Sequence, residues 1–122
     1  MTIDDARYLN LATFRRNGVA VETPIWFAEA DGKLYAFSAG DAGKVKRLRH
    51  SARARIAACD VRGHVLGPWL DAHAVLVTEP ARIQRAYTAL RAKYGWQMRM
   101  TDWLSTLSGR IGHRVVLEIT PA

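Results

Sequence analysis

The chain has 122 residues, 49% of them hydrophobic, which suits one domain over residues 1–122 and excludes an intrinsically disordered protein. The 18 Lys and Arg residues outnumber the 11 Asp and Glu residues, and the formal charge of +7 favours anionic partners such as phosphorylated cofactors or nucleic acid. The single cysteine, Cys59, excludes an internal disulfide, and no apolar run is long enough to span a bilayer. We therefore expect a soluble cytoplasmic protein without membrane contact, in which Cys59 is a small core residue.

The N-terminal part of the chain predicts a hairpin. A short helix is expected over residues 4–8, followed by a strand over residues 9–16. Asn17-Gly18 suits a type I′ turn, because both residues tolerate positive φ. Residues 19–28 then alternate between apolar and other side chains with period two, which predicts a second strand.

The next segment predicts a strand that leads into a helix. Asp31-Gly32 is a second hairpin turn, and residues 33–38 form the third strand. Residues 39–43 are small and flexible. The helix expected over residues 44–51 carries one apolar stripe at helical spacing.

The rest of the chain predicts two more strands, two helices and a closing strand. Pro80 suits the first turn of a helix, and Gly95 is a natural helix stop. The expected elements are strands at 53–60 and 67–78, helices at 80–94 and 101–107, and a strand at 113–120. Antiparallel hairpins dominate this order, so we expect a small barrel or a strongly curved sheet with helices at its ends.

The segment 38–49 is the best candidate for a functional site. Glycines let backbone N–H groups converge, and a helix start adds unpaired N–H donors and a positive dipole end. Helical geometry places Lys44 at the edge of the apolar stripe, with Lys46 and Arg47 pointing to the other side. We expect Lys44 to be the first phosphate contact, Lys46 and Arg47 the next, and Arg49 a surface charge. The alternative, equally open from the pattern alone, is a solvated basic helix face.

Two aromatic segments are further candidates. In residues 23–27, Pro24 marks a sheet edge, a bulge or a site where something other than a strand approaches, and Trp26 lies beside it. A planar ring fits such a strand, although an ordinary core strand with an edge proline is favoured from this segment alone. In residues 93–97, Tyr94 reads as core, while Trp96 follows the helix break and is free to close a pocket or an interface.

No catalytic group is evident in the sequence. The four histidines are scattered and lack metal-ligand spacing with Cys59, so no metal site is expected. Asp71 and His73 share a strand face, but a plain hydrogen bond is favoured over an acid–base pair.

These features occur in an order that resembles a known family. The chain is similar to the pyridoxamine-phosphate-oxidase-like split β-barrels, and more closely to the coenzyme F420 (deazaflavin)-dependent oxidoreductases among them. The resemblance covers nearly the whole chain and is carried by residues 11–18, 23–27, 40–49, 57–63, Gly67-Pro68 and 93–97.

The resemblance implies a fold and a cofactor site. The fold would be α+β and mainly β, a six-stranded antiparallel split β-barrel (FMN-binding split barrel-like) with flanking helices. It would form a homodimer with cofactors held between the subunits, the ring against residues 23–27 and the phosphate or acidic tail on the basic helix. The implied cofactor-binding residues are Thr23, Pro24, Ile25, Trp26, Ser38, Ala39, Gly40, Gly43, Lys44, Lys46, Arg47 and Trp96.

The resemblance and the basic segment together favour one function over two others. We expect an oxidoreductase that uses coenzyme F420 for hydride transfer to a small conjugated substrate, with the chemistry carried by the cofactor. The alternative is an FMN-binding split barrel that acts as a reductase, an oxidase or an electron carrier. A basic nucleic-acid-binding domain is disfavoured, because no recognition-helix pattern or interleaved aromatics accompany the basic run.

Overall fold

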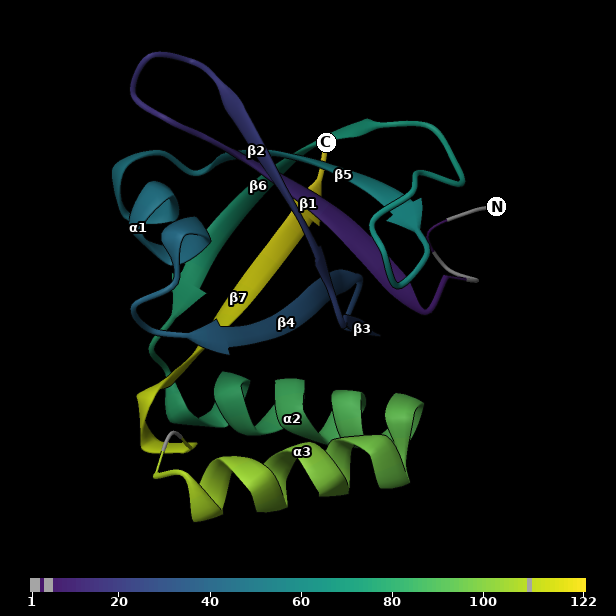
Figure 1. The fold of residues 1–122 in the computed structure, drawn as a ribbon, viewed down its shortest axis with the longest axis vertical. Coiled ribbons are helices and arrows are strands. Elements are labelled where there is room, and N and C mark those ends of the chain that lie inside the picture. The colour runs from purple at the N-terminus through teal and green to yellow at the C-terminus, as the bar shows by residue number, and fades with distance from the viewer. Residues whose placement is uncertain (1–2, 4–5, 110) are drawn as a thin grey trace.

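The computed structural model describes residue 3, residues 6–109 and residues 111–122 (Figure 1). The helix expected over residues 4–8 lies partly outside these residues, and Tyr8 already belongs to the first strand. The elements follow the predicted order, except that the strand expected over residues 19–28 is divided into β2 and β3. They are β1 Tyr8–Phe14, β2 Ala20–Ile25, β3 Ala28–Ala30, β4 Lys33–Ala39, α1 Gly43–His50, β5 Arg53–Cys59, β6 Leu70–Val77, α2 Pro80–Tyr94, α3 Trp96–Leu107, a 3-10 turn Ile111–His113 and β7 Arg114–Pro121.

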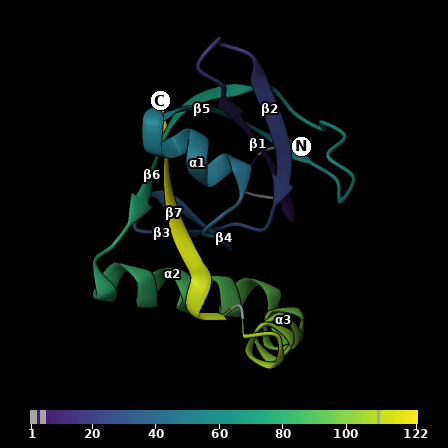
Figure 2. The ribbon, with the colours of Figure 1, turned by 60° about the vertical axis from the view of Figure 1, so that its left-hand side comes forward.

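The strands form one antiparallel sheet in the order β2-β1-β5-β6-β7-β4-β3. Although β2 and β3 lie at opposite edges of this sheet, only Trp26 and Phe27 separate them in the chain. The sheet therefore has to curl until its two edges approach each other. Figures 1 and 2 show the curled sheet, with α1 beside it and the α2–α3 pair beneath it. This is the expected mainly β split barrel with flanking helices.

The sheet has seven strands instead of six, because the strand expected over residues 19–28 changes partner. Ile25 is the last residue of β2 to pair with β1, opposite Leu9. Ala28 begins pairing with β4, opposite Tyr35. The apolar alternation continues through this bend, so the sequence pattern does not reveal it.

The two predicted hairpin turns differ in their backbone. Asp31 (φ 54°) and Gly32 (φ 79°) both have positive φ, so the hairpin turn predicted here is of type I′. At the first hairpin only Gly18 has positive φ, at 86°. The Gly18 N–H donates to the Arg15 carbonyl (2.8 Å) and the Arg15 N–H to the Val19 carbonyl (2.9 Å). This is a three-residue loop with a left-handed glycine, so the expected two-residue turn is wrong here.

The main core fills the concave side of the sheet. Alternate residues of the strands point into it, and α1 covers one side with Val45 and Leu48, which are 0% and 7% exposed. Burying each of these side chains contributes roughly 1.5–3 kcal/mol. The largest fully buried side chains of this cluster are Phe27, Leu9, Leu11, Ile56, Leu117 and Ile119.

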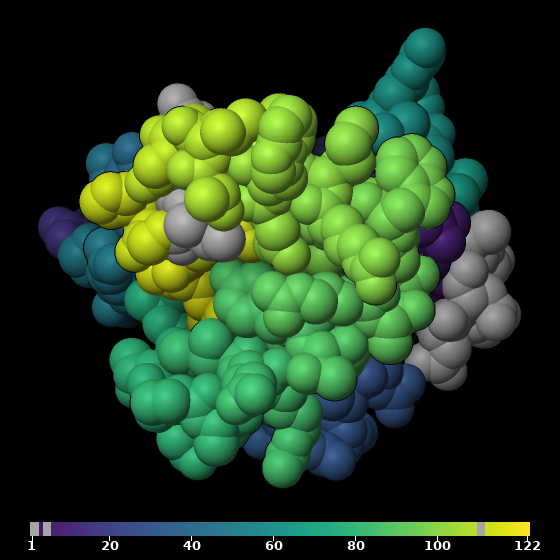
Figure 3. Space-filling model, turned by 90° about the horizontal axis from the view of Figure 1, so that it is seen from below, coloured from purple at the N-terminus to yellow at the C-terminus, as the bar shows by residue number. Residues whose placement is uncertain are grey.

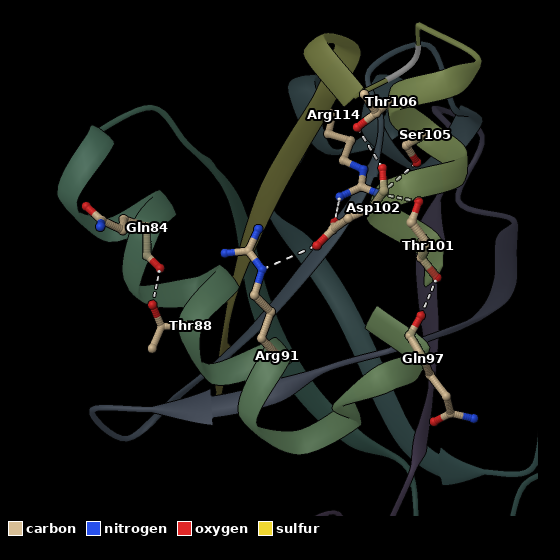
Figure 4. Close-up of polar contacts among 9 residues, drawn as sticks. All are labelled: Gln84, Thr88, Arg91, Gln97, Thr101, Asp102, Ser105, Thr106 and Arg114. Carbon is tan, nitrogen blue, oxygen red and sulfur yellow. Dashed lines mark hydrogen bonds and ion pairs between the residues drawn. The ribbon is translucent and has the colours of Figure 1, made fainter. Parts of the chain in front are cut away.

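The helices α2 and α3 form a second layer. Gly95 (φ 56°) ends α2 and immediately precedes α3, so α3 begins at Trp96 and is longer than the helix expected from residue 101. Figure 4 shows how this layer is fastened: Asp102 of α3 lies between Arg91 of α2 (3.3 Å) and Arg114 of β7 (2.6 Å). None of the helices in the described residues is long and apolar enough to cross a bilayer.

Candidate functional site

The predicted phosphate-binding segment, residues 38–49 (the cradle), runs from the end of β4 through a tight turn into α1. The Gly40 N–H donates to the His113 carbonyl (2.8 Å), and a Cβ at this glycine would lie only 3.0 Å from that oxygen. The N-cap of α1 is Ala42, which has no side chain to cap the helix, and the first turn has no acidic residue. The first N–H groups of α1 are therefore free of side-chain acceptors, which is the usual geometry of an anion site.

The cations of α1 and of the adjacent β1–β2 hairpin form no ion pair with a described residue, and Asp41 is the acidic residue that lines the nearby cleft. The ion pairs of the described residues involve Lys33, His64 and five arginines elsewhere in the chain. Uncompensated positive charge of this density is costly and is relieved by an anionic ligand. Within α1 and the β1–β2 hairpin, the cations that form no ion pair with a described residue are Arg15, Arg16, Lys44, Lys46, Arg47 and Arg49.

Two of these cations are also partly desolvated. Burial, and secondly the charge of Arg47, lowers the pKa of Lys44. Burial, and secondly the charge of Arg15, lowers the pKa of Arg47. A bound phosphate would offset both causes, because it replaces lost hydration and neutralises the repulsion between neighbouring cations.

A cleft of about 640 Å³ opens beside the cradle. Lys46 and Arg49 of α1 line it together, so Arg49 shares the cleft and is not merely the surface charge that the sequence suggested. His113 reaches the cleft from the segment before β7, 73 residues after Gly40, a neighbour that the sequence pattern did not indicate. The lining residues are Ala39, Gly40, Asp41, Lys46, Arg49 and His113.

Arg47 is oriented differently from the prediction. Its Nε donates to the Thr13 hydroxyl of β1 at 2.6 Å, and its guanidinium lies over Gly43, where a Cβ would come within 2.9 Å of Nη1. Arg47 therefore ties α1 to the barrel and leaves no room for a side chain at Gly43. Ser38, also predicted in the site, is 7% exposed and contacts the Ala39 carbonyl (3.3 Å) through its hydroxyl.

The predicted ring-binding strand lies at the sheet edge. Pro24 is exposed on β2 and pairs in register with Asn10, which confirms the edge position expected from its missing N–H. Thr23 is half-buried, whereas Ile25 is 7% exposed and belongs to the core. The side chain of Ile25 is thus not available to a ligand.

Asn10 is a candidate that the sequence analysis missed. Its amide nitrogen donates to the Gly63 carbonyl (2.9 Å), beside the Pro24 ring, which would be 3.7 Å from a Cβ on Gly63. Its Oδ1 is buried and has no partner in the described residues. An unpaired buried acceptor is costly, so a ligand N–H here would be stabilising. A polar residue at the centre of an apolar strand was the available signal.

Tyr94 fixes the bend that follows the ring-binding strand. Its hydroxyl accepts from the Phe27 N–H (2.9 Å), and its O–H lies within reach of the carbonyls of Arg7 (2.7 Å) and Phe27 (2.9 Å). Its ring stacks on Trp26, with centroids 4.7 Å apart and planes 11° apart. The Trp26 side chain is thereby held against α2.

Trp96, the remaining predicted site residue, is 70% exposed at the start of α3. The α2–α3 turn lies away from α1 in both ribbon views (Figures 1 and 2). The structure therefore does not bring this segment to the cradle within one chain.

Cys59 and the histidines offer no further chemistry here. Cys59 is 2% exposed, as expected of a core residue, and burial raises the pKa of its thiol to about 11. Among the described residues, no three His, Cys, Asp or Glu side chains gather into a possible metal site. Asp71 pairs with Arg55 (3.3 Å) instead of with His73.

The curled sheet with its flanking helices is a split barrel, and it carries a basic loop-to-helix segment beside a cleft. The family model described as pyridoxamine 5'-phosphate oxidase matches residues 2–122. The chain therefore belongs to the pyridoxamine 5'-phosphate oxidase family. No curated protein matches it significantly.

Solved structures with the same fold have diverse descriptions. A conserved hypothetical protein from Mycobacterium tuberculosis is 21% identical, with a TM-score of 0.72 over 98% of this chain and 75% of that chain. The heme storage protein HutZ from Vibrio cholerae is 14% identical, with a TM-score of 0.73 over 97% and 83%. An FAD-binding protein from Mesorhizobium loti is 19% identical, with a TM-score of 0.66 over 98% and 82%. At these identities the likeness establishes the fold alone.

Proposed function

We propose that this protein is an oxidoreductase that binds coenzyme F420 and uses it for hydride transfer to a small conjugated substrate. The observation that carries the proposal is the start of α1, where the first turn has no acidic residue, Lys44 is partly desolvated, and Lys46 and Arg49 line the adjacent cleft without an ion pair to a described residue. The phosphate and glutamate tail of a deazaflavin present several negative charges to such a surface. A cytoplasmic location belongs to the same proposal, because the only cysteine is a free thiol.

The chain's own residues would bind and orient the cofactor. Lys46 and Arg49, which line the cleft beside α1, would hold the anionic end there. Lys44 does not line the cleft and would contact the anion from the first turn of the helix. Arg47 would tie the helix to β1 through Thr13. Pro24 would offer a flat edge to the ring, and the unpaired Oδ1 of Asn10 would accept a ring N–H. The bound deazaflavin supplies the hydride chemistry, so no acid–base dyad is required of the protein.

A fluorescence titration of the purified protein with coenzyme F420 tests this proposal. We expect a saturable fluorescence change, and its absence would remove the deazaflavin from the account. The FMN alternative predicts a yellow preparation with a flavin absorbance band and tighter binding of FMN than of coenzyme F420.

We also propose that the protein acts as a homodimer. The predicted site residue Trp96 and the α1 cradle lie apart within one chain, so a shared groove requires a second copy. Exposed apolar side chains gather on the β5–β6 loop, which projects from the body (Figure 3), and on α3. These exposed residues are Val61, Val65, Leu66 and Leu70 of the loop region and Trp96, Met100, Trp103, Leu104 and Leu107 of α3.

A dimer of standard size buries about 800 Å² on each partner, an area that large apolar side chains of this number can supply. Native mass spectrometry should report two chains, and two single variants locate the interface. Val65→Asp should dissociate a dimer built on the loop, and Trp103→Asp one built on α3. A wild-type protein that stays monomeric at micromolar concentration would refute the proposal.

A further inference from the structure

A second groove of about 450 Å³ lies between α2 and the β3–β4 hairpin. It shares no lining residue with the cleft beside α1. Its walls are mostly apolar, and Glu29 and Lys93 are its two charged residues. The lining residues are Phe27, Ala28, Glu29, Leu34, Ala89, Ala92 and Lys93.

The Lys93 ammonium group occupies an unusual environment in this groove. Its Nζ lies 3.5 Å from the centroid of the Phe27 ring and 5.4 Å from that of Tyr94. It forms no ion pair with any described residue, whereas Lys33 pairs with Glu118 at 3.0 Å. The two ring faces attract the ammonium form, but such contacts contribute only about 0.5–2 kcal/mol. They do not replace the hydration that a partly buried amine without a carboxylate partner loses, so loss of hydration dominates.

A second cation adds to this effect. The Arg7 guanidinium lies 5.2 Å from the Tyr94 ring centroid, beside the same aromatic group. Burial, and secondly the charge of Arg7, lowers the pKa of Lys93 to about 8. The other facing groups do not oppose this: Glu29 makes no ion pair with Lys93, and burial raises the pKa of Tyr94 to about 12, which keeps it neutral. Desolvation and a neighbouring cation are the two conditions that activate a lysine as a nucleophile.

We propose that Lys93 is a nucleophilic amine and that the groove between α2 and β3–β4 admits an apolar aldehyde or ketone, with which Lys93 forms a Schiff base. The Nζ lone pair forms a bond to the carbonyl carbon, and the carbonyl oxygen takes up a proton. The resulting carbinolamine loses its hydroxyl group as water together with the nitrogen proton, leaving a C=N bond. No oxidant or reductant takes part, and the inference does not depend on the proposed cofactor.

Reductive trapping on the cofactor-free protein tests the inference. The protein is treated with benzaldehyde and sodium cyanoborohydride at pH 7, and the modified lysines are located by peptide mass spectrometry. An amine with a pKa of about 8 has about 300-fold more neutral form at this pH than one at 10.5. Because weaker bases are also weaker nucleophiles, we expect Lys93 to react at least about tenfold faster than Lys33, Lys44 or Lys46.

Three comparisons sharpen the test. Lys93→Arg keeps the charge and should abolish the fast labelling, while the matched variant Lys33→Arg should leave it unchanged. Arg7→Gln should slow the labelling at pH 7 severalfold. Toluene, which is apolar but has no carbonyl group, should protect Lys93 by occupying the groove. Labelling of Lys93 at the rate of the other lysines, a half-maximal rate above pH 10, or no protection by toluene would overturn the inference.

Discussion

Replacing Tyr94 with Phe removes one oxygen atom from the point where β2 passes into β3. The variant keeps the ring that stacks on Trp26, so the change isolates the hydroxyl group. The hydroxyl satisfies the N–H of Phe27, which is 2% exposed, and it donates toward the carbonyls of Arg7 and Phe27.

The cost follows from these contacts. Leaving the buried Phe27 N–H without an acceptor costs about 1–3 kcal/mol, and losing the donated hydrogen bond costs about 1 kcal/mol more. We expect the free energy of unfolding to fall by about 3 kcal/mol. For a chain of 122 residues this corresponds to a decrease in Tm of about 12 °C.

Urea unfolding followed by far-UV circular dichroism measures this change, with calorimetry as the check on Tm. Tyr8→Phe is the matched control, because the Tyr8 side chain is half-buried and makes no hydrogen bond to the described residues. It should change the free energy of unfolding by less than about 0.5 kcal/mol. A Tyr94→Phe variant as stable as Tyr8→Phe would refute the role given to the hydroxyl group.

Three further predictions concern the scaffold. Asp102→Asn leaves the buried Arg114 side chain without its carboxylate partner. We expect the free energy of unfolding to fall by about 3 kcal/mol, and amide hydrogen exchange to accelerate more in α3 than in the rest of the protein. Lys93→Met removes a partly desolvated charge, so it should raise the free energy of unfolding at pH 7 by about 1–2 kcal/mol. Solvent screening keeps this gain below the value that the full pKa shift would give. Between pH 8 and 10.5 the Lys93 amine is protonated in the unfolded chain but neutral in the folded protein, so wild type becomes more stable as the pH rises. The urea midpoints of wild type and Lys93→Met should therefore converge by pH 10.5. Gly32→Ala should cost about 1 kcal/mol, since Gly32 has φ 79° after Asp31, and equal urea midpoints would contradict this.

Local patterns in the sequence predicted most of the helices, strands and turns, but not which strands pair with one another. The type I′ turn at Asp31-Gly32 was predictable because the turn chemistry is contained in two residues. The division of the second strand was not, because apolar alternation continues past Trp26. The bend is fixed by Tyr94, which lies 67 residues away from Phe27.

The candidate site shows the same limit. The loop and basic helix were recognisable from glycines and cations in one short segment. The helical pattern did not show that Arg47 turns back to Thr13, or that His113 joins the cleft, because both contacts connect distant segments. Asn10 was overlooked because its unpaired oxygen exists only once β1, β2 and the β5–β6 loop are assembled.

The most direct test of the central claim is a fluorescence titration with coenzyme F420 on wild type, Lys44→Met and Arg85→Gln. Arg85 is an exposed cation on α2, so its variant removes one positive charge outside both the cradle and the proposed dimer interface. We predict saturable binding to wild type and to Arg85→Gln, and at least about tenfold weaker binding to Lys44→Met, because a charged contact contributes about 1.5–3 kcal/mol. No saturable binding, or equal affinities in all three proteins, would contradict the assignment of the α1 cradle as the cofactor anchor.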